Sequence, residues 1–383
     1  MLYTVPDYYD EFSCIAGDCE DTCCAGWQIV VDKDSLKKYK KVRGPYFKTI
    51  LKRVNWINGT FRQDEEKRCA FLREDNLCDM YACLGEDSLC KTCRTYPRHI
   101  EEFENVRETT LSVSCPEVAK ILMNRRDPVT FISKEEGEEE VYDDFDPFLY
   151  SMLLDLRDAM IDVLQDRSLD VKVRGGLLYG MARDVQRRVD RQEIFACQDV
   201  IEKYKKEKAR FFVEEQIYKN ECEEEDLYMF RRVMLEQLHE LELLKEDWYV
   251  QLVETRQRIF VDGSECYRDI AQNFAQWISE NNHPWEIQKE QLLVYFIFTY
   301  LCGAVYDGQV LPKVQMALIS VGILEDMMMA RWIRNENMLD TEDVIELVYR
   351  YSREVEHSDI NLKRMEKMMP VRHGLYEKST DKR

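Results

Sequence analysis

Ten of the fourteen cysteines in this chain of 383 residues lie between Cys14 and Cys115. The first cysteine-rich run, DCEDTCCAGW, places Cys23 and Cys24 side by side. Adjacent side chains point about 100° apart in a helix and to opposite faces of a strand, so neighbouring thiols cannot easily serve one site from regular backbone. We therefore expect the chain to turn between these two thiols, or the thiols to face different sites.

The expected compartment decides what such thiols do. The opening residues, MLYTVPDYYDEFSC, contain neither a basic leader nor an apolar core, which predicts a cytoplasmic protein without a secretory signal. In a reducing compartment, clustered cysteines bind metal ions or iron–sulfur clusters more often than they form disulfides. We expect metal binding in this part of the chain.

The cysteine spacing fits no single standard metal motif. Cys90 and Cys93 could form half of a zinc knuckle, but such a site needs a second pair. The two common ferredoxin spacings are absent. A radical-type cluster would need a cysteine where Gly26 stands. Cys115 directly precedes PEVAKILM and should cap a helix there, where the helix dipole favours a thiolate.

Short elements should position these ligands. Residues 26–32, GWQIVVD, predict a brief strand, and the next residues predict a short helix capped by Asp34 or Ser35 that ends before Gly44. Asn58-Gly59 predicts the turn of a hairpin. The first part of the chain should therefore be irregular, with short pieces between the ligands.

The apolar pattern changes to a helical period after residue 146. Residues 147–167 place Phe148, Met152 and Leu156 on one face, and later segments repeat this amphipathic pattern up to a helix expected to be capped by Thr341. RGGLLYG, residues 174–180, lacks the order of a phosphate-binding loop and predicts a helix with small residues at a close contact. Residues 133–146 are too acidic to pack and predict a solvated connection.

These patterns predict a mainly α protein, in which an irregular cysteine-rich metal-binding N-terminal part with a few short strands precedes an all-helical bundle. The predicted domains are residues 1–128 for the cysteine-rich part, 129–146 for an acidic linker and 147–383 for the helices. The helical part could divide into two sub-bundles near residues 260–285.

Charge and hydropathy exclude several kinds of partner. A net charge of −20 repels nucleic acid and anionic lipid and favours basic protein segments. The longest apolar run, Leu292 to Val305, is too short to span a membrane. His99 could reach a metal but is expected at the surface. The sequence indicates neither a catalytic residue nor a cofactor-binding residue other than the cysteines, and it leaves the oligomeric state open.

Four runs together resemble a known family. FSC(x4)C(x3)CCAGW, CAFLREDNLC, TCRTYPR and SCPE occur in that order over residues 12–118. This arrangement resembles the flagellin lysine-N-methylases, which share a cysteine cluster with a wider group of zinc- or iron-chelating domains. The cysteines that match the pattern are Cys14, Cys19, Cys23, Cys24, Cys69, Cys78, Cys93 and Cys115.

The resemblance implies methylation of lysine side chains on flagellin with S-adenosylmethionine as donor. It also implies an iron–sulfur cluster, of the [4Fe–4S] type, held by these cysteines, with zinc as the alternative. Two other functions stay open from the residues alone: a non-enzymatic zinc- or iron-binding interaction module, and an iron–sulfur electron-transfer protein. Eight thiols could fill two four-ligand sites, or one site with a structural remainder.

Overall fold

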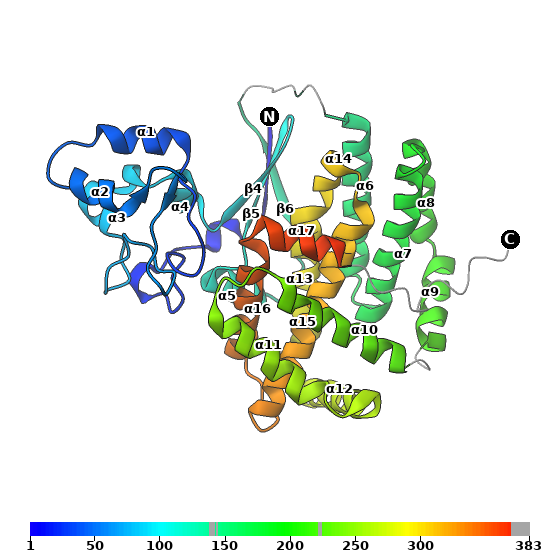
Figure 1. Ribbon diagram of the computed structural model, residues 1–383. Coiled ribbons are helices and arrows are strands. Elements are labelled where there is room, and N and C mark those ends of the chain that lie inside the picture. Colours follow the sequence, from blue (N-terminus) through cyan, green and yellow to red (C-terminus); the bar gives the residue numbers. More distant parts are fainter. Residues whose placement is uncertain (138–141, 143–144, 221–223, 369–383) are drawn as a thin grey trace.

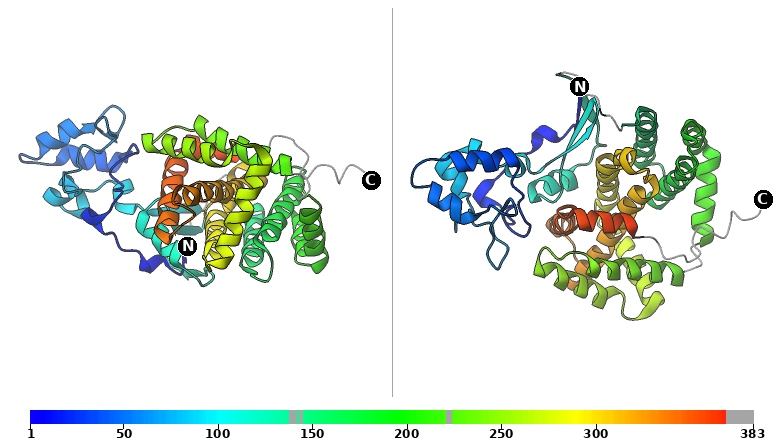
Figure 2. Two further views of the ribbon diagram at one scale, coloured as in Figure 1. Left: turned by 90° about the horizontal axis from the view of Figure 1, so that it is seen from below. Right: turned by 45° about the horizontal axis from the view of Figure 1, so that its top comes forward.

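The computed structural model describes residues 1–137, 142, 145–220 and 224–368. Figure 1 shows a cysteine-rich lobe on one side of the molecule and a larger helical body on the other, and both views of Figure 2 keep them apart. The protein is mainly α-helical, and the strands of its described residues all lie before residue 136. The predicted fold class is therefore confirmed.

The cysteine-rich lobe has a small hydrophobic core of its own. Its core includes Tyr39, Ile50, Phe61 and Phe71, which are almost fully buried. The elements around it are α1 (Lys33–Lys41), α2 (Phe47–Arg53), β2 (Val54–Asn55), β3 (Thr60–Phe61), α3 (Asp79–Leu84) and α4 (Lys91–Thr95). β2 and β3 pair antiparallel across the predicted Asn58-Gly59 turn, which is confirmed.

Two local predictions for the lobe are wrong. Residues 26–32 form no continuous strand, because Ala25 and Val30 make isolated bridges to two different segments. The cap of α1 is Asp32, whose carboxylate accepts a hydrogen bond from Ser35 N at 2.9 Å. Asp32 also accepts from Lys91 N at 2.8 Å, so a contact distant in sequence selects the cap.

A four-stranded sheet lies between the lobe and the helices. Its strands are β1 (Leu2–Pro6), β4 (Arg98–Phe103), β5 (Val106–Leu111) and β6 (Phe131–Glu135), in the order β4-β5-β1-β6. β1 runs parallel to β5 and antiparallel to β6. β6 falls inside the range 129–146 predicted to be an acidic linker, whereas residues 138–141 and 143–144 of that range lie outside the described residues.

The helical body surrounds two long central helices, α13 (Trp285–Tyr300) and α15 (Val310–Arg334), which are buried on nearly all sides. α15 packs against α7, α11, α13 and α16. The other helices are α5 (Pro116–Asn124), α6 (Pro147–Gln165), α7 (Val171–Val189), α8 (Cys197–Tyr204), α9 (Glu207–Asn220), α10 (Glu224–Gln237), α11 (Glu246–Ile259), α12 (Gly263–Glu280), α14 (Ala304–Asp307), α16 (Thr341–Glu356) and α17 (Asp359–Lys367).

One continuous core joins the sheet to the helices. It runs from Tyr8 through the sheet and α5 to Met368, and it does not break within residues 260–285. The sheet therefore shares its core with the helical body. The predicted boundary at residue 128 instead placed most of its strands in one domain with the cysteines. Arg157 on α6 strengthens this junction through two bonds of 2.6 Å to the Glu108 carboxylate on β5.

Two further helix predictions can be compared with the structure. RGGLLYG is helical, and a methyl group on Gly180 would meet the Tyr204 hydroxyl at 2.7 Å. This confirms small residues at a close contact. The predicted Thr341 cap is wrong, because Asp340 caps α16 and forms a reciprocal capping box with Asp343. Within the described ranges, no helix is long and apolar enough to cross a membrane.

Candidate functional site

Five thiols gather around the core of the lobe. Cys69 and Cys90 belong to this core, and Cys24, Cys78 and Cys93 pack against it. Short elements position them: Cys78 and Cys90 stand at the N-terminal caps of α3 and α4, and Cys69 N donates to Cys24 O at 2.8 Å. The family pattern omits Cys90, but the structure places it among the matching cysteines.

Burial and mutual contact shift the pKa values of four of these thiols. Burial raises the pKa of Cys69 to about 12 and also raises the pKa of Cys78. The hydrogen bond between Cys90 and Cys93 lowers the pKa of Cys90 and raises that of Cys93. Cys90 is therefore the first of this pair to become a thiolate.

A second group of cysteines lies where the lobe meets the helical body. It consists of Cys19, Cys23 and Cys115, which interact electrostatically with Arg353 on α16. Cys115 caps α5, as predicted. Burial nevertheless raises its pKa to about 11, although the backbone N–H groups of Val118 and Glu117 favour its thiolate.

The neighbouring pair Cys23 and Cys24 connects the two groups. The chain turns at these residues, and Ala25 N donates to Thr22 O at 3.3 Å. Cys24 packs against the lobe core, whereas Cys23 lies in the field of Arg353. Their thiols still share a hydrogen bond, which raises the pKa of Cys23. The pair thus sits at a turn and contributes to both groups.

The remaining cysteines of the first third lie at the surface. Cys14 is exposed, and Ala16 N donates to its Sγ at 3.4 Å. Cys83 is also exposed, with its Sγ 3.8 Å from Asp79 Oδ1. His99, for which metal contact was considered, forms an ion pair of 2.7 Å with Glu101 instead.

The cysteine side chains are of the type that binds soft metals, but their arrangement in the described part of the chain does not form a metal site. Thiolates are preferred ligands of zinc and of iron–sulfur clusters. Among residues 1–137, 142, 145–220 and 224–368, however, no three His, Cys, Asp or Glu side chains are arranged so that they could hold a metal ion. Closing a site here requires the thiols to move together and to lose their protons.

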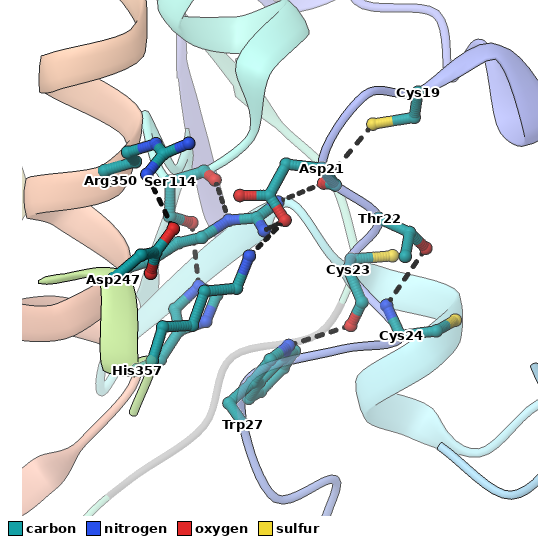
Figure 3. A network of polar contacts seen from close by, with 12 residues as sticks. Cys19, Asp21, Thr22, Cys23, Cys24, Trp27, Ser114, Asp247, Arg350 and His357 are labelled. Carbon is teal, nitrogen blue, oxygen red and sulfur yellow. Dashed lines mark hydrogen bonds and ion pairs between the residues drawn. The ribbon is translucent and has the colours of Figure 1, made fainter. Parts of the chain in front are cut away.

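A buried ion pair fastens the turn at Cys23 to α16. Arg353 Nη1 lies 2.6 Å from the Asp21 carboxylate, and its Nη2 donates to Asp21 O at 2.5 Å. The Nε of the same guanidinium donates to Ser114 O at 2.8 Å, directly before Cys115. Figure 3 shows Asp21 and Ser114 at this junction, beside Cys23. Arg353 thus contacts both segments that carry the second group of thiols.

Lys245 adds a second cation to Asp21. Its Nζ pairs with the Asp21 carboxylate, and its backbone N–H donates to Glu354 at 2.8 Å. Gly26 permits this approach, because its φ is +91° and a methyl group on its Cα would come within 2.8 Å of the Lys245 side chain. A side chain at position 26 would therefore strain the backbone and require Lys245 to shift.

Aromatic rings complete the junction. The rings of Trp27 and His357 lie 4.3 Å apart, and Trp27 Nε1 donates to Cys23 O at 2.8 Å. His357 Nε2 is 2.8 Å from Ser114 Oγ, and burial lowers the pKa of His357 to about 3. Figure 3 shows Trp27 below Cys23 and His357 below Ser114. His357 is therefore neutral at physiological pH.

Sequence reasoning did not identify these junction residues. Arg353 lies in the last turn of α16, and His357, four residues later, is the C-cap of that helix. A charged residue on the buried side of an otherwise apolar amphipathic helix is a signal that could have drawn attention to Arg353.

Comparisons with known proteins place the chain in a family. Residues 157–376 match the model of the FliB lysine N-methylase C-terminal domain. The lysine-N-methylases of Salmonella typhimurium and Salmonella choleraesuis are each 33% identical to this chain over 142 residues, which is 35% of this chain and 35% of each relative.

A third relative is covered more completely. The flagellar biosynthetic protein FliU of Salmonella muenchen is 33% identical over 143 residues, which is 35% of this chain and 85% of that protein. The match spans only about a third of the two lysine-N-methylases. No solved structure matches this chain. Because the family model covers more than half of the sequence, the chain belongs to the FliB lysine N-methylase family.

Proposed function

We propose that this protein is a protein-lysine N-methyltransferase that acts on flagellin and takes its methyl group from S-adenosylmethionine. The observation that carries the proposal is the match of residues 157–376 to the C-terminal domain of the lysine N-methylases. The names of the Salmonella relatives, a lysine-N-methylase and a flagellar biosynthetic protein, support the reaction and the flagellar substrate.

The proposed reaction sets a clear chemical requirement. The bond between the donor's sulfur and its methyl carbon breaks, the lysine nitrogen forms a bond to that carbon, and the sulfonium becomes a neutral thioether. Only a neutral amine has the free electron pair for this attack. With a pKa near 10.4, about one lysine in 2,500 is neutral at pH 7. The ammonium must therefore give a proton to solvent or to a basic group before the methyl group moves.

The charge of the chain supports a lysine-bearing protein as substrate. The net charge of −20 attracts cationic segments and repels phosphate backbones. It accelerates encounter with lysine-rich surfaces and should make association sensitive to salt. It does not by itself neutralise the amine, because negative potential stabilises the ammonium form.

We further propose that the cysteine-rich lobe holds an iron–sulfur cluster, with zinc as the alternative. The core group of Cys24, Cys69, Cys78, Cys90 and Cys93 would supply the ligands, and a reducing cytoplasm, the proposed location, would keep these thiols available. Such a group would stabilise a lobe that has only a small core of its own. Because burial raises thiol pKa values here, metal binding should release protons.

One experiment tests the enzymatic proposal. Protein purified without oxygen is incubated with purified flagellin and donor labelled in its methyl group, and the label is located by mass spectrometry of the digested flagellin. Label should appear on lysine side chains. Flagellin whose lysines have been acetylated beforehand is the matched control and should stay unlabelled, because acetylation blocks the amine. Absence of label on untreated flagellin, with donor intact and protein folded, contradicts the proposal.

A further inference from the structure

A surface hollow lies where α11, α12 and α15 meet, at the side of the helical body away from the lobe. Its volume is about 530 Å³, which is within the usual range for small-molecule sites. Its lining includes Arg258, Asn273, Trp277, Glu280, Trp332 and Asn337. All of these residues fall within residues 157–376, the segment that matches the methylase family. Figure 1 shows the three helices together at the foot of the molecule.

The hollow has an aromatic base. Trp332 is 7% exposed, and its ring centroid lies 6.3 Å from that of half-buried Trp277. Phe274 packs against both rings, with its centroid 5.7 Å from that of Trp332. Packed rings of this kind are held in position, and an aromatic face suits a flat heterocycle or a cation. The base of the hollow can therefore bind a purine ring.

Polar groups without protein partners surround this base. Trp332 Nε1 is buried and has no hydrogen-bond partner in the described part of the chain. The side-chain amides of Asn273 and Asn337 at the rim make no hydrogen bond to any other described residue. Because Trp332 Nε1 is shielded from solvent, only the two exposed amides at the rim can reach a ligand with hydrogen-bonding groups.

The rim also contains unusual backbone. Glu336 and Asn337 both have positive φ angles, of 55° and 64°. Two consecutive residues other than glycine in the left-handed region are uncommon, and such strain is concentrated at functional sites. This conformation holds the Asn337 side chain at the edge of the hollow.

We infer that this hollow binds the adenosine part of the methyl donor. The inference rests on the proposed function, because it assigns the place of that reaction's donor. An amide side chain matches the neighbouring amino donor and ring-nitrogen acceptor of adenine. A carboxylate such as Glu280 accepts from ribose hydroxyls. Arg258 can bind the carboxylate of the donor's amino-acid end.

Protein contacts hold the two charged groups in place. Gln276 Nε2 donates to Glu280 at 2.7 Å, and Arg258 Nε donates to Glu254 at 2.9 Å. A carboxylate accepts several hydrogen bonds and a guanidinium has five donors, so both groups retain capacity for a ligand. The hollow therefore offers an aromatic base and an amide edge to the adenine, a carboxylate to the ribose and a guanidinium to the amino-acid end of the donor.

The position of the hollow separates donor binding from the cysteines. Arg331, next to Trp332, pairs with Asp343 in the first turn of α16 at 2.6 Å. Arg353, which contacts the cysteine lobe, is near the other end of the same helix. Ten residues of helix separate Asp343 from Arg353, or about 15 Å. The inferred donor site and the cysteine junction thus lie toward opposite ends of α16.

Isothermal titration of the full chain with adenosine, with S-adenosylmethionine and with guanosine tests this inference. Wild-type protein should bind adenosine and the donor more tightly than guanosine. Trp277→Ala removes the stacking surface and should weaken both by about 5- to 150-fold. Asn273→Ala, an exposed change that leaves the core intact, should reduce the preference for adenosine over guanosine. Gln272→Ala, on the same helix but outside the hollow, is the control and should bind as wild type.

These measurements distinguish failure of the inferred donor site from failure of the proposed function. The inference is overturned if wild-type protein does not bind adenosine or the donor, or if both variants bind them with unchanged affinity. If binding follows the expected order but flagellin gains no label, the donor site stands and the proposed function is wrong. If flagellin is labelled while Trp277→Ala and Asn273→Ala retain wild-type donor affinity and rate, the function stands and the donor binds elsewhere.

Discussion

The ion pair between Asp21 and Arg353 should be a major contribution to the attachment of the cysteine lobe. Both side chains are nearly buried, at 12% and 6% exposure, and the pair distance is 2.6 Å. Changing Asp21 to Asn leaves the Arg353 guanidinium, and the Lys245 ammonium beside it, without their shared anion. Removing one partner of a buried pair typically costs 3–5 kcal/mol. We expect Asp21→Asn to lower the free energy of unfolding by about 3 kcal/mol or more.

The matched control is an ion pair on the surface of the same lobe. Asp34 and Lys37 lie 2.9 Å apart on α1, with side-chain exposures of 89% and 72%. Such pairs contribute about 0–1 kcal/mol because water and salt screen them. Asp34→Asn should therefore change the free energy of unfolding far less than Asp21→Asn does.

Urea unfolding followed by tryptophan fluorescence and by far-ultraviolet circular dichroism measures both variants. Trp27 lies at the junction, so fluorescence also reports separation of the lobe before global unfolding. The double variant Asp21→Asn with Arg353→Met should be more stable than the sum of the single changes predicts, because the two residues interact directly. If Asp21→Asn costs no more than Asp34→Asn and the double-variant effects are additive, the account of the junction is wrong.

Three further predictions concern the metal, a close packing contact and the effect of pH. Cys69→Ser should lower bound iron or zinc, measured by elemental analysis of protein purified without oxygen, and Cys266→Ser should not; equal metal content in both would refute the core ligand group. Gly180→Ala should reduce the free energy of unfolding by about 1–3 kcal/mol in urea melts, because its methyl group meets the Tyr204 hydroxyl at 2.7 Å. The control is Gly175→Ala, whose methyl group has its nearest side-chain atom at 3.4 Å. This change should cost nothing or stabilise the protein by a few tenths of a kcal/mol. Burial raises the pKa of Glu354 from 4.5 to about 7. Its contribution to stability is therefore full below pH 4.5 and is lost as pH rises through about 7. In urea melts, Glu354→Gln should lose less stability than wild type between pH 5 and pH 8, and an equal loss in both proteins would contradict this role of Glu354.

Local patterns predicted many of the elements correctly. Pro116 and Glu117 after Cys115 specified the start of α5, and Asn58-Gly59 specified the β2–β3 turn. These signals act within a few residues, so the sequence contains them directly. The apolar stripe from Phe148 to Val163 likewise predicted α6, although Phe148 itself is exposed and lies outside the core.

Contacts between distant segments could not be read in the same way. Three candidate caps stand together in DKDS, and the bond from Lys91 to Asp32 selects the first of them. The parallel pairing of β1 with β5 joins Leu2 to Val106 across the whole lobe. The sheet therefore packs with the helices, although its strands flank the cysteines in the sequence.

The candidate site shows the same limit. Its thiols were identified from their density in the sequence, but their division between the lobe core and the α16 junction depends on tertiary packing. Cys90 joins the core group despite lying outside the family pattern, and exposed Cys14 matches that pattern. Arg353 contacts residues more than two hundred positions away, and no local motif announces that contact.

The most direct test of the central claim is methyl transfer to flagellin itself. Purified protein, purified flagellin and fresh S-adenosylmethionine are combined, and intact flagellin is weighed by mass spectrometry over time. The account predicts stepwise mass gains of whole methyl groups that digestion places on lysine side chains, with one molecule of demethylated donor formed per step. Flagellin of unchanged mass after prolonged incubation with folded, metal-loaded protein would contradict it.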